Sequence, residues 1–353
     1  MNSVLKTLTF CIGAWGCIFP AFAFIDPLEQ PAMLSERAQV TPLYGIAGGG
    51  QLPVVTVGPR GHILRSEDAG RHFTQSESPL SSDLIAVYFV NPAQGWAVGH
   101  DGVILHSADG GKTWQRQLDG RQLGDLAIEH YANIVDDGSD SLERARHYAQ
   151  TLKHDGPTKP LLDVYFENER EGWAIGAFNL ILHTNDGGVH WKPWMERTEN
   201  PNEYSLHAIR KIGEDVFIAG ELGLLLRLDR AQQRFARVDL PYDGSLFGLT
   251  GRHGLLVVFG LRGNAWASRD DGGTWQRLDT RTNNSINAGT TLADGRFVLA
   301  STAGELLFSD REGKRIIDKT ANTRAPLYGL IQTDAGLVTI GPAGVQVDSR
   351  PLP

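Results

Sequence analysis

The sequence predicts an all-β protein, a seven-bladed β-propeller with a helical hairpin inserted into it. The stretch from Leu84 to Trp114 shows the basic pattern. Three short runs rich in β-forming residues are separated by glycine-containing turns, which is typical of a small antiparallel sheet. The pattern recurs along the chain with a period near 40 residues, and such a period with several strands in each unit indicates a propeller.

Two independent landmarks count the units. The first is the apolar residue that opens each unit: Leu43, Leu84, Leu161, Leu206, Leu246, Ile286 and Leu327. The second is the turn after the second strand, which begins at Gly58, Gly99, Gly176, Gly220, Gly260, Ser301 and Gly341. Both landmarks give seven units and a single long insertion. Because one sheet cannot bury both of its faces alone, we expect residues 24–353 to form one domain.

The first 23 residues have the pattern of a secretory signal peptide. One charge, Lys6, precedes an apolar run that ends in Ala21-Phe22-Ala23, a small-x-small cleavage signature. We therefore expect export to the periplasm or another extracytoplasmic space, and no membrane insertion after cleavage. A retained anchor and lipidation at Cys17 stay open as alternatives. Cys11 and Cys17 are the two cysteines, so a cleaved chain would contain none.

Composition favours a folded protein that binds neither nucleic acid nor a metal. The chain is 41% hydrophobic and 21% charged, and its formal net charge is -8. An acidic balance argues against nucleic acid and against a polybasic membrane-binding surface. The histidines are scattered without metal-ligand spacing, so no metal or other cofactor is expected. We expect the protein by itself to be a monomer. The histidines considered are His62, His72, His100, His106, His183, His190 and His207.

The last unit has three predicted strands, Leu327–Ile331, Leu337–Gly341 and Val345–Val347, and no fourth. A closed propeller avoids exposed strand edges. The sequence therefore predicts that a segment near Glu36–Thr41 supplies the missing strand and closes the ring.

The insertion spans about residues 117–160 and shows two helical runs. The break between them is Asp136-Asp137-Gly138-Ser139, and Asp140–Glu143 is the predicted N-terminal cap of the second helix. This hairpin joins the outer strand of the second unit to the inner strand of the third. We expect it on the same face as the Gly-x-x-Gly turns, where it would partly cover one end of the channel.

Four turns carry a Ser/Thr-x-Asp-x-Gly-x-x-aromatic motif, the Asp-box. The Asp is expected to accept backbone N–H groups of its own turn, the Gly to take a left-handed backbone, and the aromatic ring to fill the gap between blades. We interpret these motifs as structural, on the face opposite the Gly-x-x-Gly turns. The first comprises Ser66, Asp68, Gly70 and Phe73, the second Ser107, Asp109, Gly111 and Trp114, the third Thr184, Asp186, Gly188 and Trp191, and the fourth Ser268, Asp270, Gly272 and Trp275.

Together with Leu-x-x-Val-Tyr-Phe, Gly-Trp-Ala-Val-Gly and Gly-x-Ile-Leu-x-Ser, these motifs resemble the photosystem II assembly and stability factor family of Asp-box propellers and its relatives in non-photosynthetic bacteria. The resemblance covers nearly the whole mature chain and is strongest at residues 84–114 and 161–191. It implies an exported, non-enzymatic scaffold or assembly factor that holds a membrane-protein complex, with a basic patch on one face contacting the client. The hairpin and the acidic charge depart from the family and favour a different membrane complex as the partner.

The competing prediction is an Asp-box glycoside hydrolase. A sialidase needs three arginines for a carboxylate, a tyrosine nucleophile with a glutamate partner, and an acidic aspartate. Tyr44, Tyr88, Tyr165 and Tyr328 lie on or beside inner strands, in contexts that repeat by blade. Such repetition favours packing over a unique nucleophile, so no catalytic residue is assigned. A glucanase-like enzyme with paired carboxylates stays open, although those enzymes typically use two propellers.

The predicted partner-binding face is formed by the Gly-x-x-Gly turns together with the insertion. The residues assigned to it are Arg60, His100, Asp101, Phe178, Glu221 and Arg262.

Overall fold

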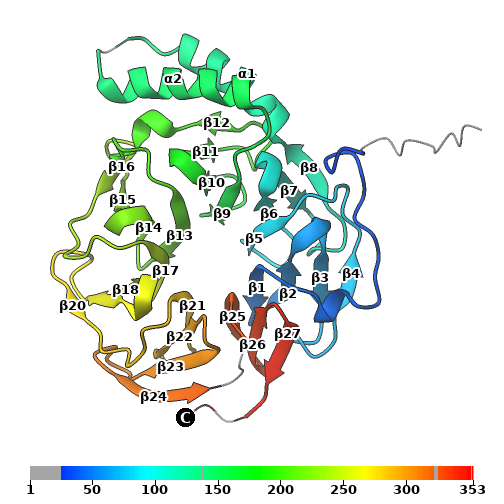
Figure 1. Cartoon of the computed structure of the whole chain (residues 1–353), viewed down its shortest axis with the longest axis vertical. Helices are drawn as coiled ribbons and strands as arrows, with labels where there is room; N and C mark the ends of the chain where they lie inside the picture. Colours follow the sequence, from blue (N-terminus) through cyan, green and yellow to red (C-terminus); the bar gives the residue numbers. More distant parts are fainter. Residues whose placement is uncertain (1–24, 137, 322–324, 351, 353) are drawn as a thin grey trace, which may run out of the picture.

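The computed structural model describes residues 25–136, 138–321, 325–350 and 352. Within them, seven antiparallel sheets surround a central opening (Figure 1), and each sheet is one blade. Six sheets have four strands and the last has three. The predicted fold, a seven-bladed β-propeller with a helical insertion, is confirmed.

The strands follow the chain from the centre outward in every blade, as the repeat predicts. Blade 1 contains β1 (Gly45–Gly49), β2 (Leu52–Val57), β3 (Ile63–Ser66) and β4 (Thr74–Ser76). Blade 2 contains β5 (Leu84–Phe89), β6 (Gly95–Gly99), β7 (Ile104–Ser107) and β8 (Gln115–Leu118). Blade 3 contains β9 (Leu161–Phe166), β10 (Gly172–Gly176), β11 (Ile181–Thr184) and β12 (Lys192–Pro193). Blade 4 contains β13 (Leu206–Ile212), β14 (Asp215–Gly220), β15 (Leu225–Asp229) and β16 (Arg234–Arg237).

The remaining blades continue the ring back to blade 1. Blade 5 contains β17 (Leu246–Arg252), β18 (Leu255–Gly260), β19 (Ala265–Ser268) and β20 (Gln276–Arg277). Blade 6 contains β21 (Ile286–Thr291), β22 (Phe297–Ser301), β23 (Glu305–Ser309) and β24 (Ile316–Ala321). Blade 7 contains β25 (Gly329–Thr333), β26 (Gly336–Gly341) and β27 (Gly344–Asp348).

The core lies between the blades, because both faces of each sheet pack against a neighbour. All five residues of β6 and all five of β10 are buried. The ring of Trp96 on β6 stacks on that of Phe166 on β9, with ring centroids 3.4 Å apart. Large aromatic side chains therefore fill the space between blades 2 and 3.

Side chains and single backbone hydrogen bonds close the ring. The prediction that a segment near Glu36–Thr41 supplies a closing strand is wrong. Residues Ala38–Val40 form a 3-10 helix, η1, which contacts β27 without pairing with it. The amide of Leu43 donates to Gly341 O at 3.1 Å, and Thr333 Oγ1 donates to Ala69 O at 2.8 Å. Buried Ala38 and Leu43 pack into the cluster between blades 7 and 1. Because Ala38 is buried within this helical turn, the segment covers the junction without extending the sheet.

The segment before the ring also ties blades 1 and 2 to the insertion. Leu28 is buried in the core of these blades, and its carbonyl accepts a hydrogen bond from Arg116 Nη1 at 2.7 Å. Glu29 pairs with Arg121 Nη1 at 2.7 Å. The segment therefore contributes packing even though it supplies no strand.

Deletion of residues 25–41 is expected to lower the melting temperature by roughly 5 °C or more, because it removes the buried Leu28 and Ala38. Thermal unfolding followed by circular dichroism measures the effect. Leu28→Ala serves as the matched single variant and should show a smaller decrease. A deletion variant that melts like the intact chain would contradict this role.

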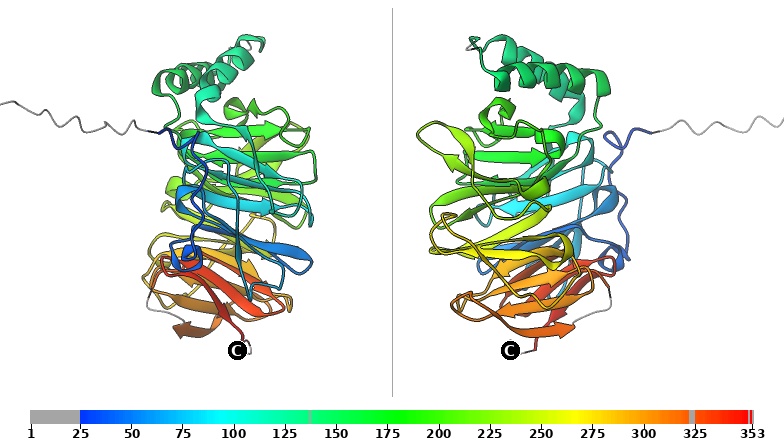
Figure 2. Two further views of the ribbon diagram at one scale, coloured as in Figure 1. Left: turned by 90° about the vertical axis from the view of Figure 1, so that its right-hand side faces the viewer. Right: turned by 60° about the vertical axis from the view of Figure 1, so that its left-hand side comes forward.

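The insertion forms the predicted pair of helices, α1 (Gly120–Ala132) and α2 (Asp140–Asp155). Ser139 is the N-cap of α2, one residue before the predicted cap, and its Oγ accepts from the Leu142 amide. The hairpin lies at the outer edge of blade 3 (Figures 1 and 2), so the expectation that it covers the channel is wrong.

The hairpin lies at the rim because its apolar side is buried there. Helix α1 contacts the outermost strand β12 and also the turn η3 (His100–Gly102), and α2 contacts η5 (Met195–Arg197). Tyr131 accepts from the Met195 amide at 3.1 Å and donates to Glu196 Oε2 at 3.0 Å. The contact with η3 keeps one end of the hairpin next to the Gly-x-x-Gly turn of blade 2.

The predicted signal peptide, including Cys11 and Cys17, lies outside the described residues. Among the residues that the structure describes, no helix has the length and apolar character needed to span a membrane.

Candidate functional site

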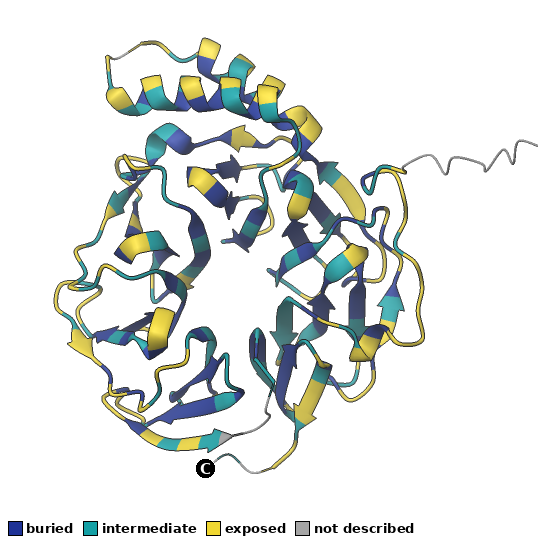
Figure 3. Cartoon of the chain, viewed as in Figure 1, coloured by how far each residue is buried: buried dark blue, intermediate teal, exposed yellow. Residues whose placement is uncertain are grey.

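The turns between the second and third strands form a ring around the central opening. They are short helical turns in blades 1 to 5, and each contacts the inner strand of the following blade. Figure 3 shows them around the channel, with exposed segments on each. They are η2 (Pro59–Gly61), η3 (His100–Gly102), η4 (Ala177–Asn179), η6 (Glu221–Gly223) and η7 (Leu261–Gly263). We call this side of the propeller the turn face.

The second residue of each of these turns has a left-handed backbone. Its φ lies between 49° and 57° in all five turns, and none of the five residues is glycine. A non-glycine side chain in this region carries strain of about 1 kcal/mol or more, and such strain concentrates at functional sites. The shared geometry therefore makes these positions candidates for binding. They are Arg60, Asp101, Phe178, Leu222 and Arg262.

The structure places all six predicted partner-binding residues in these turns, but they are not equally available. Asp101 accepts a hydrogen bond from Ser82 Oγ at 2.6 Å, and Glu221 accepts from the Ser205 amide at 2.9 Å. These two carboxylates hold the turns to the adjoining loops. The exposed members of the predicted set are Arg60, His100, Phe178 and Arg262.

A basic groove adjoins the turn of blade 5. It has a volume of about 460 Å³, and its lining includes Arg262, Arg277 and Arg281. None of these three guanidinium groups forms an ion pair with the residues that the structure describes. Asp279 also lines the groove, so its positive charge is partly offset. Unpaired arginines are suited to carboxylates, which they bind in a bidentate manner.

The central channel is lined by the inner strands, and its wall contains an ion pair with a buried carboxylate and a part-exposed arginine. Asp163 on β9 accepts hydrogen bonds from the Ile209 amide at 2.9 Å and from Arg210 Nη1 on the next blade. Burial raises the pKa of Asp163, and the charge of Arg210 opposes that shift. The pair joins blades 3 and 4 at the channel wall.

The channel does not hold the constellation of a sialidase. Arg210 and Asp163 are the arginine and the carboxylate among its described lining residues, and they are paired with each other. Burial raises the pKa of Tyr88 and of Tyr165, which disfavours the phenolate that a nucleophile needs. The geometry therefore gives the hydrolase alternative no support.

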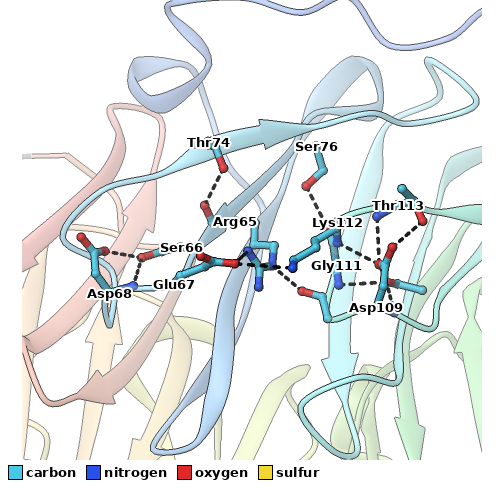
Figure 4. Close-up of polar contacts among 12 residues, drawn as sticks. Arg65, Ser66, Glu67, Asp68, Thr74, Ser76, Asp109, Gly111, Lys112 and Thr113 are labelled. Carbon is cyan, nitrogen blue, oxygen red and sulfur yellow. Dashed lines mark hydrogen bonds and ion pairs between the residues drawn. The ribbon is translucent and has the colours of Figure 1, made fainter.

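The Asp-boxes lie between the third and fourth strands of their blades, where their hydrogen bonds are internal. Figure 4 shows two of them side by side. Asp109 Oδ1 accepts the amides of Lys112 at 3.0 Å and Thr113 at 2.9 Å. Burial alone would raise the pKa of Asp109, but these bonds and those from the Thr113 and Ser107 hydroxyls lower it to about 2.

The other three boxes repeat this internal bonding. In each, the hydroxyl of the first residue donates to the carboxylate, at 2.7 Å for Asp68, 2.9 Å for Asp186 and 2.8 Å for Asp270. The same hydroxyl accepts the amide of the box glycine at 2.8 to 2.9 Å. These glycines have φ values of 94°, 85° and 95°, the left-handed backbone expected of them. They are Gly70, Gly188 and Gly272.

The aromatic residues of these boxes differ in burial. Phe73 is buried in the cluster between blades 7 and 1, and Trp191 is buried with its ring edge-on to Phe166, at a centroid distance of 5.8 Å. Trp275 is half-buried, and its indole N–H donates to Asp239 O at 2.9 Å. The expectation that the ring fills a gap between blades therefore suits Phe73 and Trp191 better than Trp275.

The boxes also connect neighbouring blades. Gly111 has a φ of 84°, and its carbonyl accepts from Ser76 Oγ of blade 1 at 2.6 Å. Gln117 of blade 2 donates in the same way to Gly187 O of the box of blade 3, at 2.9 Å. The structural interpretation of these motifs thus has a physical basis.

Sequence reasoning missed part of the turn face. Leu222 and Leu261 are absent from the predicted set, although Leu222 occupies the same turn position as Phe178 and Arg262. Aligning all five turns by that second position would have found Leu222. Arg277 and Arg281 lie in the strand and loop that follow, and no sequence pattern relates them to Arg262.

The fold and the internally bonded boxes define an Asp-box β-propeller with a ring of strained turns on one face. The chain belongs to the family described as photosynthesis system II assembly factor YCF48, whose model matches residues 50–129 and 147–324. The unmatched gap lies within the helical hairpin, from the end of α1 to the first half of α2.

Curated relatives carry the same family name. The chain is 24% identical over 159 residues to photosystem II assembly lipoprotein Ycf48 of Synechococcus sp. (strain CC9902), covering 44% of this chain and 47% of that protein. It is 28% identical over 171 residues to the protein of that name from Parasynechococcus marenigrum (strain WH8102), covering 47% of this chain and 51% of the relative. The chain thus spans about half the length of the curated relatives it matches.

Solved structures show the same fold. A structure described as YCF48 bound to D1 peptide has a TM-score of 0.61 at 16% identity, covering 90% of this chain and 94% of that one. YCF48 from Cyanidioschyzon merolae has a TM-score of 0.59 at 14% identity, covering 90% and 97%. The WD40 propeller domain of Doa1 reaches 0.59 at 8% identity, covering 91% and 95%. At these identities the likeness concerns the fold.

Proposed function

We propose that this chain is an exported, non-enzymatic assembly factor that binds a membrane protein of the cell envelope through its turn face. The observation that carries the proposal is the ring of strained turns, whose second residues are held in one geometry by five consecutive blades. Four of these second residues are exposed and available to contact another molecule: Arg60, Phe178, Leu222 and Arg262. Membership of an assembly-factor family supports the same function.

Two further findings support export and a membrane partner. The curated relatives are named lipoproteins, and the first 23 residues have the composition of an export signal. One structural relative is described as bound to a peptide of D1. We propose by analogy that the turn face of this chain binds a segment of a membrane protein, which need not belong to a photosystem. We propose that the protein is monomeric until it meets this partner.

Reversing charge at Arg60 and Arg262 is expected to reduce the recovery of the membrane partner severalfold. Both residues are exposed on the turn face, so Arg60→Glu/Arg262→Glu reverses the charge at two places on that surface. The measurement is chemical crosslinking in an envelope fraction, purification of the tagged chain and quantitative mass spectrometry of the membrane proteins recovered.

A matched pair controls for the change in net charge. Arg71 and Arg170 are exposed on the Asp-box side, and Arg71→Glu/Arg170→Glu makes the same change there. This control should recover the partner as the wild type does. Equal recovery with both double variants would place the partner on another surface.

A further inference from the structure

Three consecutive blades expose apolar side chains on the turn face. Phe178 on blade 3 is 54% exposed, Leu222 on blade 4 is 52% exposed and Leu261 on blade 5 is 37% exposed. All three belong to equivalent turns, η4, η6 and η7. We call these three side chains the apolar arc. Phe178 and Leu222 are the second residues of their turns and Leu261 is the first residue of its turn. Single exposed apolar residues are common on protein surfaces, but three in equivalent turns of neighbouring blades indicate a binding surface.

Backbone strain sets two members of the arc apart. Phe178 has φ 56° and Leu222 has φ 49°, a region that bulky residues rarely occupy. Glycine would take the same backbone without strain, and the third residue of the turn in blade 4, Gly223, already does so. Folding alone therefore gives no reason to place a large apolar side chain at these positions and expose half of it to water.

The blade 5 end of the arc is basic, whereas the cation at its blade 3 end is paired. At the blade 3 end, Lys159 Nζ lies 5.2 Å from the centre of the Phe178 ring, and it pairs with Asp155 Oδ2 at 2.9 Å. At the blade 5 end, the basic groove begins at Arg262, directly after Leu261. The surface is therefore apolar along blades 3 to 5 and basic at its blade 5 end. Its complement is a segment with apolar side chains and acidic residues beside them.

We propose that the apolar arc binds an extended segment of the partner in which several apolar side chains are followed by acidic residues. The apolar side chains contact Phe178, Leu222 and Leu261, and the carboxylates pair with the arginines of the groove. This inference rests on the proposed function, because it specifies which part of the turn face holds the partner and the chemistry that it recognises.

Glycine variants separate binding from folding. In Phe178→Gly/Leu222→Gly both strained positions receive the residue that suits their backbone, while the exposed apolar surface is lost. The variant should melt at least as high as the wild type and bind more weakly. Phe178→Ala/Leu222→Ala removes the same surface and keeps the strain, so it should match the loss of binding without the gain in melting temperature.

The direct test uses fluorescein-labelled dodecapeptides and fluorescence anisotropy with the intact chain. The first peptide carries alternating leucines followed by three glutamates. The second has lysines in place of the glutamates, and the third has serines in place of the leucines. We expect the wild type to bind the first peptide most tightly, and both double variants to lose at least about fivefold in affinity for it. Arg277→Gln/Arg281→Gln should reduce the preference for glutamate over lysine.

The outcomes are decisive. Unchanged affinity in the glycine and alanine variants, or equal binding of the lysine peptide, would overturn the proposal. The envelope crosslinking experiment with Phe178→Gly/Leu222→Gly separates this proposal from the proposed function. If wild type and variant recover the same membrane protein equally, the proposal that the apolar arc binds the partner is wrong and the proposed function stands. If the wild type recovers no membrane protein, the proposed function falls, and the peptide measurements decide on the arc.

Discussion

Arg210→Gln is expected to lower the free energy of unfolding at neutral pH by about 1–3 kcal/mol, because it leaves the buried carboxylate of Asp163 without its part-exposed cation. Asp163 is 3% exposed, whereas the Arg210 side chain is 42% exposed at the channel wall, so channel water replaces part of the lost interaction. Urea denaturation of both proteins measures the difference.

The loss should depend on pH in a defined direction. Burial already raises the pKa of Asp163 in the folded protein, and removing Arg210 raises that pKa further. A carboxyl group with a raised folded pKa contributes stability below its unfolded pKa, and this contribution is lost as the pH rises through the folded pKa. The free energy of unfolding of the variant should therefore approach that of the wild type near pH 4 and lie further below it toward pH 7.

Asp163→Asn/Arg210→Gln is the matched control, because it removes both charges and keeps an amide oxygen for the Ile209 amide. It should be more stable at pH 7 than Arg210→Gln alone. A deficit of Arg210→Gln that stays constant from pH 4 to pH 7 would show that the pair contributes by packing rather than by charge.

Trp96→Ala is expected to cost about 3–5 kcal/mol of unfolding free energy, because it empties a fully buried site between blades 2 and 3. The stacking on Phe166 is lost together with the buried area of the indole. The midpoint of urea denaturation should shift accordingly, with little change in the slope of the transition.

Trp96→Phe should retain most of the stability. The indole N–H of Trp96 is buried and makes no hydrogen bond with the described residues, so phenylalanine removes an unsatisfied donor while keeping an aromatic ring. A phenylalanine variant as unstable as the alanine variant would mean that the site depends on the indole shape rather than on aromatic packing.

The blade count, the strand order and the helical insertion could be predicted from the sequence because each rests on periodicity. A unit such as Leu84–Trp114 contains its own strands and turns, and local signals place them. The position of the hairpin could not be predicted in this way. It depends on where Leu123 and Tyr131 find apolar partners, and these are provided by blade 3 and not by the channel.

The turn face could be predicted from the sequence only in outline. The repeat identifies Arg60, Phe178 and Arg262 as turn residues, but it does not show that their backbones are left-handed. The internal bonds of Asp101 and Glu221 depend on neighbouring loops, so sequence reasoning counted them as free contacts.

The strand expected at Glu36–Thr41 is wrong for a related reason. The open edge of β27 predicts a pairing partner, but it does not reveal that Ala38 is buried in a helical turn against the junction. Burial of this kind depends on tertiary packing between the first and last blades. Local sequence signals carry no information about it.

The junction between blades 7 and 1 has a mechanical consequence. In many propellers a strand from one end of the chain pairs with the sheet of the blade at the other end. A whole ladder of backbone hydrogen bonds then resists opening of the ring. Here the described residues hold that joint with the Leu43 amide, the Thr333 hydroxyl and a small apolar cluster. Under tension on the two ends of the ring, the propeller should open at this joint first.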